Sequence, residues 1–493
     1  MRVEPTKNVA DFLSKAIPHF IGGRFHPGAP GTTAPVLNPS DGSTLATVAM
    51  GGAPEIDEAV NAAWRAFPSW SQLLPADRAA KLHRFAEHLQ KHAADLALLE
   101  SLDVGKAITA AEGFDVPFGI ECLRYYADLS VLAQYDVPLA LRNIEARVHR
   151  APFGVCGFIF PWNFPFTLLM WGIAPALAAG NTVVVKPSEV TPLSSMFVAK
   201  LAAEAGIPDG VINMVIGDGP TAGAALGAHP GIKRMSFTGS PEVGRKIGEV
   251  CGRNLVPCKL ELGGKGAAVV FDDADVEATA QQLAAAITLN TGQVCCTATR
   301  WIVHEKIYDR FVEKAVAALK SVKMGPGTSR ETQMGPLVSA AQRQRVMNYL
   351  EKGAKEGAQV VLAGGAAAPG QCEGGFYVQP SLLAGSPDNV CCREEIFGPS
   401  AFLLKFNDQT DPVSLVNRLA YGLANSVWTS DLKRAGQIAE RMLAGNGWIN
   451  AHNVFAYGLP YGGVNLSGFG GGVNGPETFY DYLRPQTIAR PLA

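Results

Sequence analysis

The sequence predicts an α/β protein with a doubly wound parallel sheet, followed by a second α/β domain. Three observations predict this fold. The strand patterns are short, helical patterns separate them in a regular way, and 493 residues suffice for roughly two to four domains of about 100–200 residues each. In such a sheet, ligands bind outside the carboxyl ends of the strands. We therefore look for a binding crevice at those ends.

The first part of the chain is predicted to contain loops and helices. Prolines make the segment up to Pro39 rich in loops. Residues 55–99 then show the apolar spacing of helices, with breaks expected at Pro68 and Pro75. Residues 147–160 have the pattern of strands, and the regular alternation begins there.

A series of strands and helices follows, and it defines the predicted sheet. Strands are predicted at 182–186, 211–216, 233–238 and 266–271, with helices at 194–205, 221–226 and 242–251. The strand ends carry Lys186-Pro187-Ser188-Glu189, Gly217-Asp218-Gly219 and Thr238-Gly239-Ser240.

A second βα series is predicted after Asp272. It starts with a helix at 276–289, a strand at 300–303 and a helix at 307–319, and continues to about residue 450. A glycine-rich surface loop is expected over 462–475, and the strand-like residues near 488 need a partner edge.

Composition excludes several classes of protein. The sequence is 47% hydrophobic and 17% charged, with a formal charge of −2, which suits a compact enzyme and gives no attraction for nucleic acid or an anionic membrane. The most apolar run, 168–185, contains two glycines, a proline and an asparagine, so we read it as a buried helix leading into a strand rather than a membrane span. Residues 1–7 lack the apolar core of a signal peptide.

Nine cysteines show neither a disulfide framework nor the spacing of a metal site. We expect free thiols, a reducing cytoplasmic location and no metal. A free cysteine is most often a small buried hydrophobe, and this is the alternative to a catalytic role for Cys295. Glu261 lies between apolar residues ahead of an apolar strand, where a carboxylate needs a partner or a function. A thiolate and a carboxylate base together would suffice to form and hydrolyse a thioester.

The predicted strand ends offer candidate nucleotide contacts, each with a simpler alternative. Gly217 to Gly223 resembles a phosphate loop, but its third glycine falls one position late, so it could be a tight turn. Gly239-Ser240 precedes a helix whose N-terminus favours a pyrophosphate. Lys186 and Glu189 could bind a ribose, and the carboxylate would favour NAD over NADP; the alternative is a surface ion pair. Asn163 could donate to an oxyanion or cap the following helix.

Six motifs in this order resemble those of the NAD(P)-dependent aldehyde dehydrogenase superfamily. The resemblance covers roughly residues 20–490. The motifs are Pro161-Trp162-Asn163-Phe164-Pro165, Lys186-Pro187-Ser188-Glu189, Phe237-Thr238-Gly239-Ser240, Leu260-Glu261-Leu262-Gly263-Gly264-Lys265, Gly292-Gln293-Val294-Cys295 and Glu395-Ile396-Phe397-Gly398-Pro399.

The resemblance implies that an aldehyde is oxidised with NAD to its carboxylic acid, with NADP the less favoured cofactor. Cys295 would be the nucleophile, Asn163 the oxyanion donor and Glu261 the base, whose pKa burial should raise to roughly 6–7. This base favours hydrolysis over transfer to coenzyme A. The cofactor would contact Phe160, Trp162, Lys186, Ser188, Glu189, Gly219, Phe237, Gly239, Ser240, Leu262, Glu395 and Phe397.

The implied substrate wall is apolar and aromatic. It suits apolar, aromatic or quaternary-ammonium aldehydes, whereas an anionic semialdehyde would need a cation such as Arg124. The wall consists of Phe164, Leu168, Trp171, Val294, Phe455 and Tyr461.

The resemblance also implies a division into domains and a homodimer or homotetramer. Residues 1–130 and 153–262 would bind NAD, and 263–465 would form the catalytic domain. Residues 131–152 and 466–493 would form an oligomerisation arm and a C-terminal strand, the arm pairing with that strand of the other domain or subunit.

One segment departs from the family pattern. After Ser467-Gly468-Phe469-Gly470 many relatives carry Arg-Glu-Leu-Gly, and here Gly471 to Glu477 differ. This puts the packing of that segment in doubt. Two other functions stay open: a binding protein without activity, and a cysteine hydrolase that cleaves esters without NAD. NADH formation from aldehydes separates both from a dehydrogenase.

Overall fold

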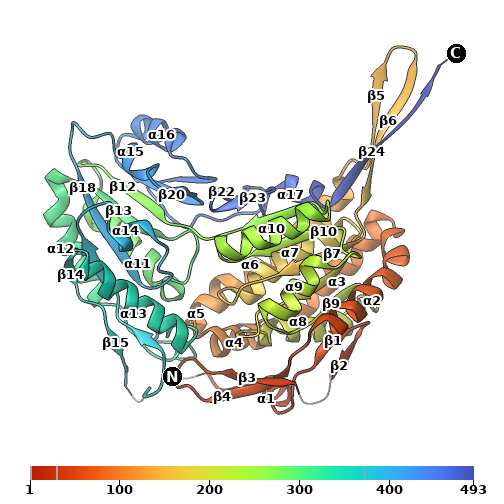
Figure 1. Ribbon diagram of the computed structural model, residues 1–493, viewed down its shortest axis with the longest axis horizontal. Coiled ribbons are helices and arrows are strands. Elements are labelled where there is room, and N and C mark those ends of the chain that lie inside the picture. Colours follow the sequence, from red (N-terminus) through yellow and green to blue (C-terminus); the bar gives the residue numbers. More distant parts are fainter. Residues whose placement is uncertain (1–2, 29–31, 371, 493) are drawn as a thin grey trace.

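Two β-sheets organise the chain, and a three-stranded arm projects from it (Figure 1). The computed structural model describes residues 3–28, 32–370 and 372–492. The first sheet takes strands between residues 19 and 261 and one short strand at 468–469, and the second takes strands between residues 266 and 449. The predicted α/β architecture with doubly wound parallel sheets is confirmed. The exact domain boundaries stay a prediction.

The first sheet has eight strands in the order β2-β1-β9-β8-β7-β10-β11-β23. Its central strands β9, β8, β7, β10 and β11 run parallel, and antiparallel strands close both edges. Every residue of β7 and β8 is buried, as expected for strands covered on both faces. The strands are β1 (His19–Ile21), β2 (Arg24–His26), β7 (Val155–Ile159), β8 (Thr182–Lys186), β9 (Ile212–Met214), β10 (Arg234–Thr238), β11 (Cys258–Glu261) and β23 (Gly468–Phe469).

Helices cover the two faces of this sheet. The apolar run 168–185 forms the buried helix α7 and then β8, as predicted. The helices are α2 (Ala53–Ser71), α3 (Pro75–Lys91), α4 (Ala93–Val104), α5 (Ile108–Ala110), α6 (Val116–Leu132), α7 (Pro165–Ala178), α8 (Leu193–Glu204), α9 (Ala224–Ala228) and α10 (Pro241–Arg253), with π-helical turns at η1 (Ala111–Asp115) and η2 (Gly219–Gly223).

Two predictions about the N-terminal part were wrong. The supposed loop region up to Pro39 forms a helix and three strands, α1 (Lys7–Leu13), β1, β2 and β3 (Thr33–Leu37), and β4 (Thr44–Ala49) follows it. Pro68 lies inside α2 rather than at a break, so the helix tolerates the loss of one N–H donor in its last turn. Pro75 begins α3, where a proline is favoured.

The second sheet has seven strands in the order β14-β17-β18-β13-β12-β20-β21. All neighbours are parallel except the edge strand β14. The strands are β12 (Gly266–Val270), β13 (Ala298–His304), β14 (Gln359–Leu362), β17 (Ser381–Ala384), β18 (Ser400–Phe406), β20 (Ala424–Trp428) and β21 (Asn446–Ile449). The helices of this part are α11 (Val276–Thr288), α12 (Tyr308–Lys320), α13 (Ala340–Lys355), α14 (Val390–Arg393), α15 (Pro412–Val416) and α16 (Leu432–Arg441).

Small elements complete the chain. Two short two-stranded ladders pair β15 (Ala366–Ala367) with β16 (Tyr377–Val378) and β19 (Tyr421–Gly422) with β22 (Val464–Asn465). Short 3-10 turns lie at η3 (Leu289–Gly292) and η4 (Glu305–Ile307), and α17 (Pro476–Tyr480) precedes the last strand. No helix in the described ranges is long and apolar enough to cross a membrane.

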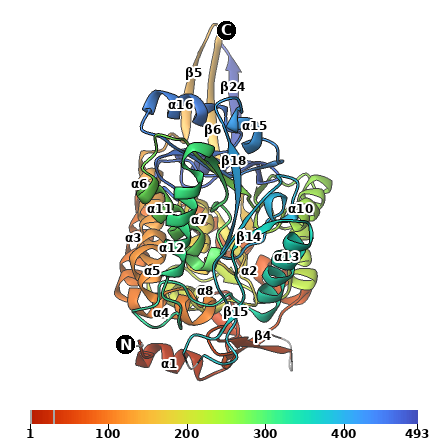
Figure 2. The same cartoon turned by 90° about the vertical axis from the view of Figure 1, so that its left-hand side faces the viewer.

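The projecting arm consists of β5 (Asp136–Leu141), β6 (Ile144–Pro152) and β24 (Leu483–Pro491). Strand β24 pairs along its whole length with β6 of its own chain, which corrects the predicted pairing with another domain or subunit. The arm extends away from the body in both views, with the C-terminus near its tip (Figures 1 and 2). Both outer strands of the arm, β5 and β24, are edges.

Candidate active site

A cavity of about 290 Å³ lies where the two sheets meet. The carboxyl ends of β7 and β10 contribute Pro161 to Phe164 and Thr238 to Ser240 to its wall, and Leu262 follows β11. The second part of the chain contributes Val294 to Cys296, among others. The cavity is therefore at the edge of the first sheet where a ligand was expected.

The segment that carries Cys295 is held in an unusual backbone conformation. Asn290 and Thr291 have φ values of 45° and 57° in the turn after α11, and each left-handed non-glycine residue typically costs on the order of 1–3 kcal/mol. Buried hydrogen bonds hold this turn: Gln293 Nε2 donates to the Asn290 carbonyl (3.0 Å), and Gln293 Oε1 accepts from the Val338 amide (2.9 Å). The sulfur that follows is thus fixed by its surroundings.

The two neighbouring thiols are not equivalent. A hydrogen bond from Cys296 lowers the pKa of Cys295, with a smaller contribution from the Tyr461 hydroxyl, and together they outweigh the effect of burial. Tyr461 Oη lies 3.4 Å from Cys295 Sγ. The same interaction raises the pKa of Cys296, whose sulfur contacts Asn453 Oδ1 at 3.4 Å. The thiolate is therefore favoured at Cys295.

Asn163 lies beside Cys295 in the same cavity wall. Its Nδ2 donates to the Gln293 carbonyl (3.0 Å), and Asn290 Nδ2 donates to the Asn163 carbonyl (2.9 Å). A primary amide has two N–H donors, so one stays available for an oxygen in the cavity. The N-cap of α7 is Phe164 and has no side-chain cap, which excludes the alternative that Asn163 caps this helix.

Glu261 is the last residue of β11 and is almost completely buried. Burial raises the pKa of its carboxyl well above the usual value; Lys259 acts against this shift, and Cys295 adds to it. Its Oε1 has no hydrogen-bond partner among the described residues. A buried, unpartnered carboxylate with a raised pKa is suited to accept a proton near neutral pH.

Gly263 and Gly264 lie between β11 and β12 and allow this connection to pass close to Glu395 and the Cys295 segment. A Cβ at Gly264 would lie 2.1 Å from the Cys295 carbonyl oxygen, and one at Gly263 would lie 2.3 Å from Glu395 Oε2. Glu395 Oε1 accepts the Gly264 amide at 2.7 Å, and burial raises the pKa of Glu395 to about 7. Any side chain at these two positions would displace either the cysteine segment or Glu395.

The structure brings only some of the predicted cofactor residues to the cavity. Its wall includes Trp162, Gly239, Ser240, Leu262, Glu395 and Phe397. The ring of Phe397, which has a φ of 63°, lies edge-on to Trp162 at 5.3 Å. The predicted residues that do not line the cavity are Phe160, Lys186, Ser188, Glu189, Gly219 and Phe237.

Several of these residues also have structural contacts. Lys186 Nζ and Glu189 Oε2 form an ion pair of 3.0 Å at the carboxyl end of β8. The Ser240 hydroxyl accepts the Val243 amide and so caps α10. Gly219 begins a short π-helical turn, and the Asp218 side chain caps this turn by accepting the Thr221 amide. The segment therefore forms a tight turn into a helix, as in the simpler interpretation.

All six residues of the predicted substrate wall line the cavity. The rings of Trp171 and Phe455 each lie 5.5 Å from Tyr461. Arg124 is absent from the wall; it lies 3.7 Å from Glu121. The motifs did not identify five further lining residues, which come from segments without a chemical signature: Phe114, Thr167, Leu289, Gln342 and Arg345.

One histidine near the site was also not predicted. His452 Nε2 hydrogen-bonds the Cys296 carbonyl (2.8 Å), and Nδ1 pairs with Ser426 Oγ (3.0 Å). Burial lowers the pKa of His452 to about 4, so the ring is neutral near pH 7. With both nitrogens engaged, His452 supports the backbone beside Cys295 and does not serve as its base.

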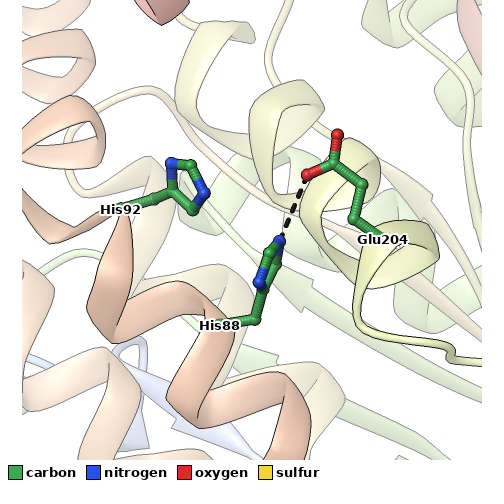
Figure 3. A group of neighbouring side chains, drawn as sticks. All are labelled: His88, His92 and Glu204. Atoms are coloured by element: carbon green, nitrogen blue, oxygen red, sulfur yellow. Dashed lines mark hydrogen bonds and ion pairs between the residues drawn. The ribbon is translucent and has the colours of Figure 1, made fainter.

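Among the described residues, one group could hold a metal ion: His88, His92 and Glu204 (Figure 3). His88 Nε2 already pairs with Glu204 Oε2 at 3.1 Å, and Lys200 Nζ lies 3.3 Å from the other carboxylate oxygen. None of these side chains lines the cavity. The group is explained as a surface ion-pair cluster between α3 and α8.

Comparison with known proteins agrees with this geometry. The model of the aldehyde dehydrogenase family matches residues 25–488. The chain belongs to the aldehyde dehydrogenase family. Phenylacetaldehyde dehydrogenase of Pseudomonas fluorescens is 39% identical over 92% of both chains, and betaine aldehyde dehydrogenase of Mesorhizobium japonicum is 38% identical over 95% of this chain and 94% of its own. This protein is accordingly an enzyme, an aldehyde dehydrogenase.

The fold comparison gives the same result. An aldehyde dehydrogenase of Bacillus cereus, solved as an NAD⁺ complex, superposes with a TM-score of 0.97 at 37% identity and covers 100% of both chains. The resemblance seen in the motifs therefore extends over the whole fold of this aldehyde dehydrogenase.

Proposed function

We propose that this aldehyde dehydrogenase oxidises an apolar, aromatic or quaternary-ammonium aldehyde to its carboxylic acid with NAD, through a thioester on Cys295. One observation carries the proposal. Cys295, whose pKa is lowered, shares a single cavity with the Asn163 amide and Tyr461; Glu261 does not line this cavity, but its Oε1 would lie 3.3 Å from a Cβ at Gly462, the residue after Tyr461.

The residues fit NAD at this position. The N-terminus of α10, with Gly239 and Ser240, faces the cavity and favours a pyrophosphate. Glu189 is a third exposed at the end of β8 and can accept hydrogen bonds from a ribose. When bound, NAD supplies the hydride acceptor.

The chain's own residues carry the remaining chemistry. The Cys295 thiolate attacks the aldehyde carbon, and the Asn163 amide and the Cys295 backbone N–H hold the resulting oxyanion; losing one such donor typically slows a reaction on the order of 10²–10³-fold. After the carbon loses its hydride, a thioester remains. Glu261 takes a proton from water, which attacks the thioester and releases the acid and the thiolate.

The substrate class follows from the wall of the cavity. Rings at Trp171, Phe455 and Tyr461 offer apolar surface and faces for a cation. Arg124 is absent from the wall, and Arg345, which does line it, donates to the Glu395 carbonyl at 2.8 Å. The relatives named above act on phenylacetaldehyde and betaine aldehyde by name, which supports this range.

A panel assay tests the proposal. We expect NADH formation, followed at 340 nm, to be fastest with aromatic, aliphatic or quaternary-ammonium aldehydes and independent of coenzyme A. Highest kcat/KM on a short anionic semialdehyde would contradict the substrate class. Ester cleavage with no NAD requirement, and no NADH from any aldehyde, would contradict the function.

Substituting Glu189 by glutamine should weaken the preference for NAD. The carboxylate repels the 2′-phosphate of NADP, and its removal should raise the ratio of kcat/KM for NADP to that for NAD roughly tenfold, or about 1.4 kcal/mol. The measurement is steady-state kinetics with both cofactors. Glu249→Gln, exposed near the far end of α10, is the control and should leave the ratio unchanged; an unchanged ratio in Glu189→Gln would remove Glu189 from the ribose site.

We also propose a homodimer or homotetramer in the cytoplasm. The arm exposes apolar side chains at Leu139, Leu141, Ile144 and Ile488, and its outer strands offer free edges for another subunit. All nine cysteines are free thiols, which suits a reducing compartment. Sedimentation of the purified chain tests the assembly, and a concentration-independent monomer would contradict it.

A further inference from the structure

A buried ammonium group lies behind the proposed base. Lys259 is 1% exposed and precedes Glu261 by two residues on β11, so both side chains leave the same face of the strand. Lys259 Nζ donates to the Gly472 carbonyl at 2.5 Å and lies 3.5 Å from Asp481 Oδ2. Neither the proposed chemistry nor the matched motifs give this lysine a function.

The atypical glycine segment connects the lysine to the base. Gly472, whose carbonyl receives the ammonium, lies against Gly462: a Cβ at Gly462 would be 2.9 Å from Gly472 Cα and 3.3 Å from Glu261 Oε1. A Cβ at Gly471 would lie 2.5 Å from Asp481 Oδ2. The segment that departs from the family pattern therefore leaves the space in which Lys259 and Asp481 meet beside Glu261.

Among Lys259, Arg234, Asp481 and Glu261, the charges balance when Glu261 is ionised; the Cys258 thiol, whose pKa its hydrogen bond with Cys251 lowers to about 7, also lies near Arg234. The cations are Lys259 and Arg234, whose Nη2 lies 3.7 Å from Asp481 Oδ2. The anions are Asp481 and Glu261; Tyr482, whose ring lies 5.3 Å from Lys259 Nζ, and Tyr461 are neutral near pH 7. The Cys295 thioester has no charge, so in these four side chains two cations face two carboxylates. Protonation of Glu261 would leave one positive charge in excess among them, in a poorly solvated region.

We propose that Lys259 is a positioning residue for thioester hydrolysis, whose buried ammonium, held by Gly472 and Asp481, keeps Glu261 in the ionised, proton-accepting form. This inference rests on the proposed function. In the step concerned, water loses one proton to a Glu261 oxygen and its hydroxide adds to the thioester carbon, while the C–S bond breaks and the electron pair returns to Cys295. Burial lowers the pKa of Lys259 to about 8, so below that pH Lys259 keeps its protons throughout the step.

The pH dependence of turnover tests the proposal. Hydrolysis needs ionised Glu261, so kcat rises with pH through the Glu261 pKa. Removing the neighbouring positive charge raises that pKa. Lys259→Gln should therefore shift the acid limb of the pH profile, the range over which kcat rises with pH, to higher pH by roughly one to two units. The NADH burst of the first turnover should keep its amplitude, because acylation does not use Glu261 as the hydrolytic base.

Three further variants separate charge from structure. Glutamine can still donate to the Gly472 carbonyl, and Lys259→Met removes both charge and donor, so both should show the shift. Lys259→Arg keeps the charge and should leave the limb in place, as should Lys246→Met on the exposed face of α10. Thermal unfolding identifies variants that fold, and any one folded neutral variant suffices for the test.

Two outcomes would overturn the inference: an unmoved acid limb in a folded neutral variant, or an equal shift in Lys259→Arg. Failure of the proposed function gives a different result. In that case the unaltered enzyme forms no NADH, or Glu261→Gln turns over at the full rate, whatever Lys259 does.

Discussion

Cys295→Ala is expected to abolish aldehyde oxidation. The substitution removes the only atom proposed to bond to the aldehyde carbon, so neither the covalent adduct nor the thioester can form, and we expect kcat to fall by roughly 10⁴-fold or more. The side chain is partly exposed in the cavity and small, so the fold should persist. NADH formation at 340 nm and thermal unfolding measure the two effects.

The adjacent cysteine supplies a matched control. Cys296→Ala removes a thiol of the same size one residue away, whose pKa is raised instead of lowered. Cys296→Ala should still form NADH. The pKa of the Cys295 thiol should rise in this variant, because the hydrogen bond from Cys296 is lost. Equal losses in both variants, or activity in Cys295→Ala, would refute Cys295 as the nucleophile.

Glu261→Gln is expected to separate acylation from hydrolysis. Glutamine has nearly the same shape but accepts no proton from water, and general base catalysis typically contributes 10²–10⁴-fold, so steady-state turnover should fall by roughly that factor. The first turnover should still release a burst of NADH equal to the enzyme present. Rapid-mixing absorbance at 340 nm measures the burst, and mass spectrometry should detect the acylated chain.

The pH dependence provides a second check on Glu261. Because burial raises its pKa well above the usual value, kcat of the unaltered enzyme should rise with pH through a value well above that of a free glutamate, and Glu261→Gln should lose this limb. A full steady-state rate in Glu261→Gln would show that another group activates the water.

The sequence was sufficient to predict the elements whose patterns are local. The strand Thr182–Lys186 has the predicted bounds, because three consecutive buried valines shortly before a proline allow little else. The cavity residues from Pro161-Trp162-Asn163 and Thr238-Gly239-Ser240 converge because parallel strands present their carboxyl ends at one edge.

Features that depend on distant partners were not predictable. Strand β1 joins the first sheet through Phe20 and Met214, and no local pattern marks that pairing among the surrounding prolines. The contact between Lys259 and Asp481 was likewise not predictable, because the fold brings together two residues that are far apart in the chain. Asn163 is not used as a helix cap because α7 begins at Pro165 with Phe164 at its N-cap, and composition does not determine this start.

In the proposed homo-oligomer, the arm is expected to make the enzyme sensitive to dilution. The outer strands of its three-stranded sheet, β5 and β24, are edge strands whose outward main-chain donors and acceptors pair with no further strand of the described chain. Leucine and isoleucine side chains of the arm are exposed. Such edges template the addition of further strands. In the proposed homo-oligomer, dilution would separate the protomers and expose these edges to water, so we expect the specific activity to fall as the protein is diluted.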